Sequence, residues 1–197
     1  MAFNVISLEK MLDALDASKV EAVLKTFKSI SLRDERHDVE IFLHQKAIEF
    51  EKTAIASTYL VFDEETNVLL GFFSLANKPL TMNKRNFERL SKTQQKKLKS
   101  SGRLIGDKYQ VISYLIGQLG KNYSQEAISN GGITGEQLLT LAYNKVIEAS
   151  RIIKAKYVWL ECENIEYLES FYSNFGFQKI PNYVSDNNLS VMLLKIK

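Results

Sequence analysis

The sequence predicts an α/β (α+β) fold in which helices flank one mixed, mostly antiparallel sheet. Three observations lead to this class. Ser57–Phe62 and Val68–Ala76 are rich in β-forming residues and are separated by a polar turn, which predicts an antiparallel hairpin. Helical patterns around residues 138–153 and 167–172 each stand between strand-like runs, and such units require parallel crossovers. A chain of 197 residues is long enough for one substantial core.

Composition narrows the class of protein. Hydrophobic residues make up 45% and charged residues 25% of the chain, which is typical of a globular protein and excludes disorder as its main state. The sequence has no apolar run near the roughly 20 residues of a membrane helix, and its N-terminus lacks the features of an export signal. A single cysteine excludes an internal disulfide and a cysteine-based metal site. We expect a cytoplasmic protein with no membrane contact.

The first 37 residues predict a helical extension. Phe3–Ile6 is either an edge strand or a lead-in, and Ser7 is expected to cap a first helix. Ser18 with Glu21 three residues later has the form of a capping box and predicts a second helix. Residues 1–37 are therefore assigned to an N-terminal helical hairpin, and residues 38–197 to the main domain.

Asp38 is expected to cap the next helix, whose apolar residues keep helical spacing as far as Ala54. His37 and His44 are the two histidines of the chain, and they fall at the start and in the body of this helix. No group of carboxylates or thiols surrounds them in the sequence. Solvated or packing roles are therefore favoured over metal ligation.

Positive charge is concentrated in one window. Residues Lys84–Arg103 contain eight basic residues and one acid, a net charge of +7 in a chain whose total is +3. The window is predicted to be an insertion that is either a solvated loop or short helix, or a contact surface for nucleic acid. It contains Phe87 as its single aromatic residue, which indicates attraction to phosphates without base stacking.

The run Tyr109–Gly120 predicts a strand, and a polar segment then leads to a glycine-rich loop at Asn130–Glu136 and a helix up to Ile153. Free amide groups at a helix start, with the positive end of the helix dipole behind them, favour an anion and most often a phosphate. The alternative is that the glycines satisfy turn geometry alone. The spacing matches neither the dinucleotide fingerprint nor the P-loop.

The C-terminal part predicts a strand at 156–163, a short helix and two last strands. Val158, Leu160 and Cys162 alternate with Glu161 and Glu163, so Cys162 is interpreted as a small buried hydrophobe. The helix that follows is expected to end at a left-handed Gly176. Strands at 177–180 and 189–196 complete the chain.

Two segments together resemble the GNAT superfamily, the Gcn5-related N-acetyltransferases. Leu115-Ile-Gly-Gln-Leu-Gly120, with the glycine loop and Leu138-Leu139, resembles the acyl-CoA strand and pyrophosphate loop of that family. Val158–Asn164 with Phe171-Tyr-Ser-Asn-Phe-Gly-Phe177 is similar to its late strand and helix end. The resemblance covers about residues 38–197. It departs from the family pattern at Ile133, where an inner glycine is usual.

The resemblance implies a site for acetyl-CoA. The strand that ends at Gly120 would splay from its neighbour and pair with the pantetheine arm, and Leu119 would supply an oxyanion-binding amide. Tyr172 matches the usual general acid of the family, and either Glu161 or Glu163 is a candidate general base. The implied acyl-CoA contacts are Gln118, Leu119, Gly120, Asn130, Gly131, Gly132, Ile133, Thr134, Gly135 and Glu136.

The acceptor of the acetyl group is open at this point. The first hypothesis is an amine of a small molecule or protein. Ile41–Phe50 and Gly71–Ala76 resemble the branch of toxin acetyltransferases that modify aminoacyl-tRNA, so transfer to aminoacyl-tRNA, with Lys84–Arg103 against the tRNA, is the second. The third is an acyl-CoA-binding regulator without catalysis. Members of this family often pair through sheet edges, which implies a homodimer.

Overall fold

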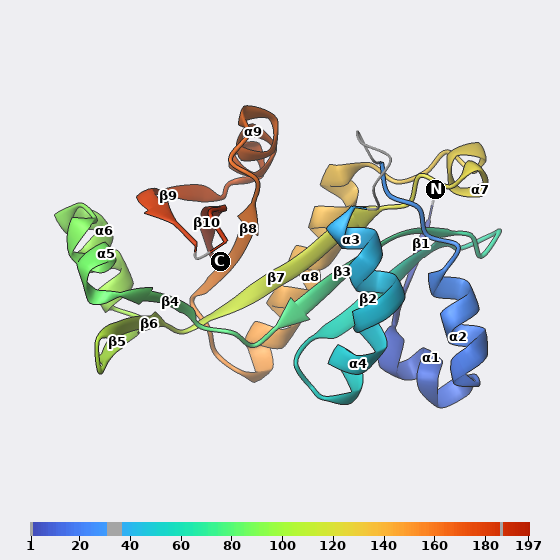
Figure 1. The fold of residues 1–197 in the computed structure, drawn as a ribbon, viewed down its shortest axis with the longest axis horizontal. Helices are drawn as coiled ribbons and strands as arrows, with labels where there is room; N and C mark the ends of the chain where they lie inside the picture. The colour runs from blue at the N-terminus through green and yellow to red at the C-terminus, as the bar shows by residue number, and fades with distance from the viewer. Residues whose placement is uncertain (1, 31–36, 186) are drawn as a thin grey trace. The chain divides into compact units, whose positions relative to one another are not determined.

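The computed structural model describes residues 2–30, 37–185 and 187–197. The chain forms two compact units, each built from two stretches of sequence. Unit 1 contains Met1–Ala76 and Gly117–Tyr143, and unit 2 contains Asn77–Ile116 and Asn144–Lys197. The elements are labelled in Figure 1. In the part of the chain that the structure describes, no helix is long and apolar enough to cross a membrane.

Unit 1 is a sheet covered on both faces. Strand order is β1-β2-β3-β7, with β1/β2 and β2/β3 antiparallel, so the predicted hairpin and edge strand are confirmed. Its elements are β1 (Phe3–Ser7), α1 (Leu8–Ala14), α2 (Ala17–Leu24), α3 (Asp38–Ile41), the π-helix η1 (Phe42–Lys46), α4 (Ala47–Lys52), β2 (Ser57–Asp63), β3 (Leu69–Ala76), the end of β7 (Ser113–Lys121), α7 (Gln125–Ser129) and the start of α8 (Gly135–Ile152).

The N-terminal helices contribute directly to the core of unit 1. Leu8, Leu24 and Phe27 are at most 1% exposed and join Leu43, Phe72 and their neighbours in one apolar cluster. This burial explains why α1 and α2 form: each presents one apolar face to the strands. On the other face of β3, the side chain of Leu138 on α8 lies against Gly71.

Two predicted helix starts in unit 1 were wrong, one by two residues and the other by one. The capping box at Ser18 and Glu21 does not form, because α2 begins at Ala17 after Asp16 and Ser18 lies inside the helix. His37, not Asp38, is the N-cap of α3, and Asp38 is the first helical residue. The cap predicted at Ser7 is confirmed, since its side chain accepts a hydrogen bond from the Lys10 amide.

Unit 2 contains the other half of the large sheet and a second, smaller sheet. The order β7-β8-β10-β9 continues from β7, with β7/β8 parallel and β8/β10 and β10/β9 antiparallel. The remaining elements are β4 (Leu80–Asn83), α5 (Lys84–Arg89), α6 (Lys92–Lys99), β5 (Gly102–Ile105), β6 (Lys108–Val111), β8 (Tyr157–Cys162), α9 (Glu166–Phe175), β9 (Gln178–Val184) and β10 (Ser190–Lys195). The predicted fold class, a mixed and mostly antiparallel sheet flanked by helices, is confirmed.

The two expected crossovers are present. Helix α8 connects the parallel strands β7 and β8. Helix α9 connects β8 to β9, which runs in the same direction because β10 lies between them and is antiparallel to both. The register of β7 with β8 covers Ser113–Leu115, although β7 continues to Lys121. The pairing with β8 thus covers only the start of β7, and the splay of these strands that the resemblance implies stays a prediction.

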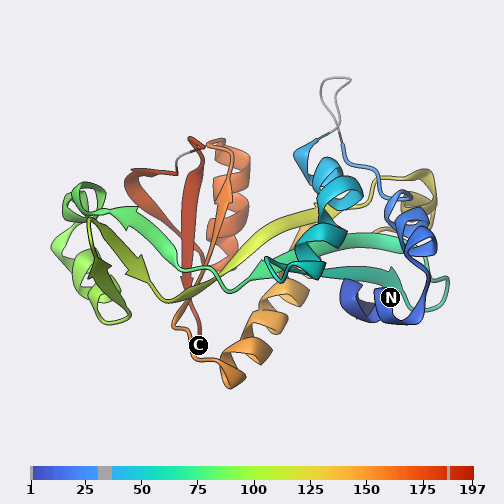
Figure 2. The ribbon, with the colours of Figure 1, turned by 60° about the horizontal axis from the view of Figure 1, so that its bottom comes forward.

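The basic window folds into ordered structure. Lys84–Arg103 forms α5, α6 and the start of β5, and these helices pack on the small sheet β4-β6-β5 (Figure 2). We call residues 80–111 the basic subdomain. A further difference is that the predicted strand Tyr109–Gly120 is two strands, β6 and β7, which belong to different sheets. The hydroxyl of Ser113 bonds to the Leu80 amide and the Val111 carbonyl at the change of sheet.

Candidate functional site

The end of β7 in unit 1 carries the three residues expected to bind pantetheine. Gln118 and Leu119 are half-buried, and Gly120 is buried. A Cβ atom on Gly120 would lie 2.5 Å from Val39 Cγ1 and 2.9 Å from Phe72 Cε1. The sequence therefore has glycine at position 120 because the core packs directly on this backbone. The pantetheine contacts of these residues stay a prediction.

The glycine pair after α7 has a defined backbone role. Gly131 and Gly132 have φ angles of 82° and 61°, which strain other residues. The Gly131 amide donates to the Ile128 carbonyl at 2.9 Å, and the Gly132 amide donates to the Ala127 carbonyl at 3.0 Å. These bonds end α7, so both amides are already used. The Asn130 amide likewise donates to the Glu126 carbonyl.

The start of α8 has the geometry expected of an anion site. Thr134 and Gln137 form a reciprocal capping box: the Gln137 amide donates to Thr134 Oγ1 at 3.1 Å, and the Thr134 amide donates to Gln137 Oε1 at 2.9 Å. The amides of Gly135 and Glu136 lie in the first turn and have no carbonyl partner within the helix. The amides of Asn130, Gly131, Gly132 and Thr134 have partners, so the proposed phosphate contacts narrow to the amides of Ile133, Gly135 and Glu136.

Ile133 explains the departure from the family pattern. Its side chain is 3% exposed and belongs to the apolar interior. A glycine at this position would remove that burial, worth about 1.5–3 kcal/mol for a side chain of this size. Ile133 thus replaces the usual glycine of the family pattern because its side chain packs in the apolar interior.

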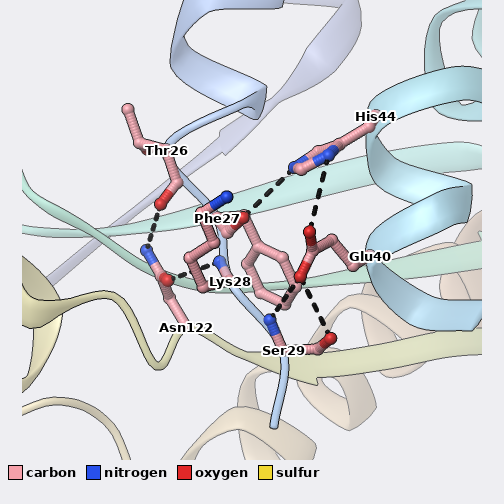
Figure 3. Close-up of polar contacts among 7 residues, drawn as sticks. All are labelled: Thr26, Phe27, Lys28, Ser29, Glu40, His44 and Asn122. Carbon is pink, nitrogen blue, oxygen red and sulfur yellow. Dashed lines mark hydrogen bonds and ion pairs between the residues drawn. The ribbon is translucent and has the colours of Figure 1, made fainter. Parts of the chain in front are cut away.

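Polar side chains fix the segment Thr26–Ser29 beside the end of β7 (Figure 3). Asn122, 4% exposed, accepts from the Lys28 amide at 2.9 Å and donates to the Leu69 carbonyl at 2.7 Å. Sequence analysis did not identify Asn122. Its hydrogen bond to Lys28 joins residues that are 94 positions apart, so no local pattern indicates it.

A second set of polar contacts holds Ser29 and Phe27 from the α3–η1 helix (Figure 3). Glu40 Oε2 accepts from the Ser29 amide at 2.8 Å and from the Ser29 hydroxyl at 3.1 Å. His44 Nε2 lies 3.2 Å from the Phe27 carbonyl, and His44 Nδ1 lies 3.9 Å from Glu40 Oε1. His44 thus has polar contacts as well as a packing role. In the described part of the chain, no three His, Cys, Asp or Glu side chains are grouped to hold a metal ion.

Tyr172 lies in unit 2, on α9. It is 9% exposed, and its ring contacts Phe171 and Phe177 edge to face. Burial, with a smaller contribution from the neighbouring Cys162, raises the pKa of the Tyr172 hydroxyl well above its usual range. Burial also raises the pKa of the Cys162 thiol to about 11, so this thiol is protonated at neutral pH. A phenol in this environment stays protonated and can donate a hydrogen bond or a proton.

The two candidate bases differ in environment. Glu161 is half-buried on β8, opposite Val191 of β10. Glu163 is exposed and follows the last residue of the strand. Glu161 and Glu163 were expected to lie on one face of the same strand. Because β8 ends at Cys162, Glu163 lies beyond the strand and the two side chains do not share a strand face. The side of β8 that carries Tyr157 and Trp159 is also buried, since both residues are 5% exposed.

A polar cluster anchors α9 to the sheet of unit 2, and sequence analysis did not find it. Glu169 Oε1 accepts from Lys179 Nζ at 2.5 Å and from Ser190 Oγ at 2.6 Å. Lys179 and Ser190 also donate to Asn164 Oδ1. The hydrogen bond from Lys179 is the main cause that lowers the pKa of Glu169, and the hydrogen bond from Ser190 is the second. The cluster holds the turn of α9 that precedes Tyr172.

Comparison with known proteins places this fold. No family model matches the chain, and no curated protein matches it significantly. Among solved structures, a Tyr-to-Phe mutant of KacT matches with a TM-score of 0.63 and 18% identity, over 99% of this chain and 95% of that one. AtaT in complex with acetyl-methionyl-tRNAfMet matches with a TM-score of 0.61 and 17% identity, over 98% and 95%.

AtaTR bound to acetyl-CoA matches with a TM-score of 0.58 and 16% identity, over 98% of this chain and 92% of that one. At these identities the likeness concerns the fold. The chain thus shares the fold of KacT, AtaT and AtaTR.

Proposed function

We propose that the protein is an acetyl-CoA-dependent N-acetyltransferase whose acceptor is the amino group of an aminoacyl-tRNA. The observation that carries this proposal is the fold match over 98% of the chain to AtaT in complex with acetyl-methionyl-tRNAfMet. The match to AtaTR bound to acetyl-CoA supports the choice of acetyl donor. The ordered basic subdomain supports a polyanionic acceptor over the small amine or protein that we placed first from sequence.

The residues of unit 1 fit a pyrophosphate. The α8 start offers the Gly135 and Glu136 amides, and the capping box of Thr134 and Gln137 fixes the direction of the helix. The helix dipole adds positive potential at the same point. The Leu119 amide is proposed to bind the oxyanion, and Gln118 and Gly120 to pair with pantetheine through their backbone.

Acetyl-CoA supplies a thioester, and the reaction joins its acetyl carbon to the amine nitrogen while the carbon–sulfur bond breaks. The amine must lose one proton, and the departing thiolate must gain one. Tyr172 is proposed to give the proton to the thiolate, because it matches the tyrosine that is the usual general acid in the family that the sequence resembles. Its hydroxyl carries a proton at neutral pH, although burial makes it a weaker acid than a free phenol. Glu161, which is half-buried, is preferred over the exposed Glu163 as acceptor of the amine proton, directly or through water.

The acceptor is tested with labelled acetyl-CoA and a panel of aminoacyl-tRNAs, polyamines and peptides. We expect label in the aminoacyl-tRNA fraction. Label in polyamines or peptides alone would support the small-amine or protein acceptor. Thermal stabilisation by acetyl-CoA without transfer to any member of the panel would favour a non-catalytic regulator.

The role of Tyr172 is tested with Tyr172→Phe, which keeps the buried ring and removes the hydroxyl. We expect kcat for acetyl transfer to fall by roughly 10²–10⁴, the usual contribution of a general acid. Acetyl-CoA should stabilise the variant against heat as it does the parent. Tyr167→Phe on the same helix, where the side chain is 77% exposed, is the matched control and should keep full activity. An unchanged rate for Tyr172→Phe would reject the acid role.

A further inference from the structure

The basic subdomain has a fixed framework. Gln95 Nε2 donates to the carbonyls of Glu88 and Leu90 at 3.2 and 2.8 Å and so joins α6 to α5. The rings of Phe87 and Tyr109 stack with centroids 3.8 Å apart and join α5 to β6. Helices of six and eight residues are unstable alone, so these contacts are what order them.

This framework directs lysines toward one hollow. The hollow has a volume of about 490 Å³ and lies between α5, α6 and the small sheet. Lys84, Lys92 and Lys99 line it, the first from α5 and the other two from α6. Glu88 is the carboxylate among the described lining residues, and its Oε1 is 3.9 Å from Lys84 Nζ. The hollow is thus positively charged at neutral pH.

The positive charge around the hollow indicates how large a ligand the basic subdomain can bind. The other basic side chains of the window are exposed on the outer faces of α5 and α6 and on β5: Arg85, Arg89, Lys96, Lys97 and Arg103. Positive charge therefore continues well beyond the hollow. Such a surface is complementary to an extended polyanion, and a single small anion would neutralise little of it.

The aromatic residues of the subdomain indicate the mode of binding. Phe87 and Tyr109 are the aromatic residues of positions 80–111 and are 5% and 6% exposed. One face of each ring is covered by the other ring, and Lys99 Nζ lies 6.0 Å from the centroid of Phe87, so little of either ring is exposed to stack on a base. Recognition must then use phosphates and be independent of sequence.

We propose that the basic subdomain binds the phosphodiester backbone of RNA, with Lys84, Lys92 and Lys99 holding phosphates at the hollow. The choice of RNA as the polyanion rests on the proposed transfer to aminoacyl-tRNA. The surface contributes affinity and orientation and makes no base contact. It therefore serves any tRNA equally, and selection among tRNAs must come from elsewhere.

The test measures binding of uncharged tRNA by fluorescence anisotropy between 0.05 and 0.5 M salt (about one decade) without acetyl-CoA, using the full chain. Lys92→Gln/Lys99→Gln removes two phosphate contacts, each worth about 0.7–0.9 in the slope of log K against log salt. We expect the slope to become shallower by about 1.4–1.8. If the variant and the parent bind equally at 1 M salt, this change in slope makes the variant bind roughly 25- to 60-fold more weakly than the parent at 0.1 M salt.

Two further variants control for charge and folding. Lys10→Gln/Lys52→Gln removes the same charge from exposed positions of α1 and α4 and should leave the slope within about 0.3 of the parent. Lys92→Arg/Lys99→Arg keeps the charge and should keep the slope. An equal loss of slope in the Lys10/Lys52 variant, or none in Lys92→Gln/Lys99→Gln, would overturn the proposal.

This outcome is separate from the outcome for the proposed function. If Lys92→Gln/Lys99→Gln binds RNA like the parent while aminoacyl-tRNA is acetylated, the RNA surface is wrong and the activity stands. If the salt slope falls as expected but no aminoacyl-tRNA is acetylated, the surface stands and the acceptor is wrong.

Discussion

At the scale of single residues, Glu40 illustrates a buried carboxylate whose role is structural. Burial opposes its ionisation, but the Ser29 amide and hydroxyl, with the nearby charges of His44 and Lys28, outweigh burial and lower the pKa of Glu40. A carboxylate with a lowered pKa stabilises the fold above its ordinary titration range. That stability is lost as the pH falls through the lowered pKa.

Glu40→Gln should therefore be destabilised in a pH-dependent way. At pH 7 we expect a loss of about 1–3 kcal/mol in the free energy of unfolding, because the Ser29 donors lose a charged acceptor. Below about pH 4, under the usual glutamate pKa of about 4.3, the parent also loses the stabilisation from ionised Glu40. The difference in free energy of unfolding between the parent and the variant should then narrow.

Urea unfolding at pH 7, 5 and 3.5 measures this change. Glu49→Gln, an exposed position on α4, is the control and should stay within about 0.5 kcal/mol of the parent. A gap of the same size at pH 3.5 and pH 7 would show that ionisation of Glu40 is not the source of the stability.

Residues of this kind were the hardest to predict from sequence. Tyr172 could be proposed as a site residue because it stands in a local motif with Phe171 and Gly176. Gly176 does end α9 in the left-handed region, whereas the catalytic role of Tyr172 stays a prediction. Glu40 and Asn122 carry no such motif, since their partners lie on distant segments. The glycine-rich loop was predicted to bind phosphate because its glycines precede a helix, yet Gly131 and Gly132 end α7 and their amides are used there.

At the scale of elements, helix α9 depends on its polar anchor. Its N-cap residue, Ile165, makes no side-chain capping bond, so the bonds of Glu169 to Lys179 and Ser190 hold its first half to the strands. Replacing Glu169 leaves the buried hydroxyl of Ser190 without this acceptor. The following turn of the helix carries Tyr172.

A double-mutant cycle on Glu169→Ala and Lys179→Ala tests this anchor. We expect Glu169→Ala to unfold at a lower urea concentration than the parent, because Lys179 and Ser190 lose their shared acceptor. The coupling between Glu169 and Lys179 should be favourable but small, because both side chains are partly exposed. Glu166→Ala on the exposed first turn is the control. Strict additivity of the two changes would mean that the pair contributes nothing of its own.

Element types were mostly predictable, whereas boundaries and sheet membership were not. Long periodic patterns gave α8, and alternation gave β8 and the β2–β3 hairpin. The split of Tyr109–Gly120 into β6 and β7 was hidden because Ile112, which is 56% exposed, extends the apolar run across the break. The π-helix η1 was hidden because its residues keep an ordinary helical pattern.

At the scale of the whole molecule, residues 2–30 contribute to the core of unit 1. Strand β1 pairs with β2, and Leu8, Val20 and Phe27 are fully buried. Each such side chain contributes about 1.5–3 kcal/mol by burial. Together they are comparable with the total stability of a domain, about 5–15 kcal/mol. The division of the chain at residue 37 remains a prediction.

Removal of residues 1–37 should therefore prevent folding of unit 1. We expect the fragment 38–197 to be recovered in inclusion bodies or to lack a cooperative thermal transition. Circular dichroism during heating, with the full chain as control, provides the measurement. A soluble fragment with a sharp transition would show that residues 38–197 form an independent domain.

The basic subdomain packs on two aromatic residues of β8, and this contact limits which substitutions and deletions the chain tolerates. Trp159 donates to the Lys78 carbonyl, Tyr157 donates to the Lys97 carbonyl, and both rings join the core that includes Leu80 and Leu98. Excision of the insertion would leave two aromatic rings facing water on a central strand. The insertion and these two aromatic positions are therefore physically coupled, and a chain without the insertion would need polar residues at positions 157 and 159.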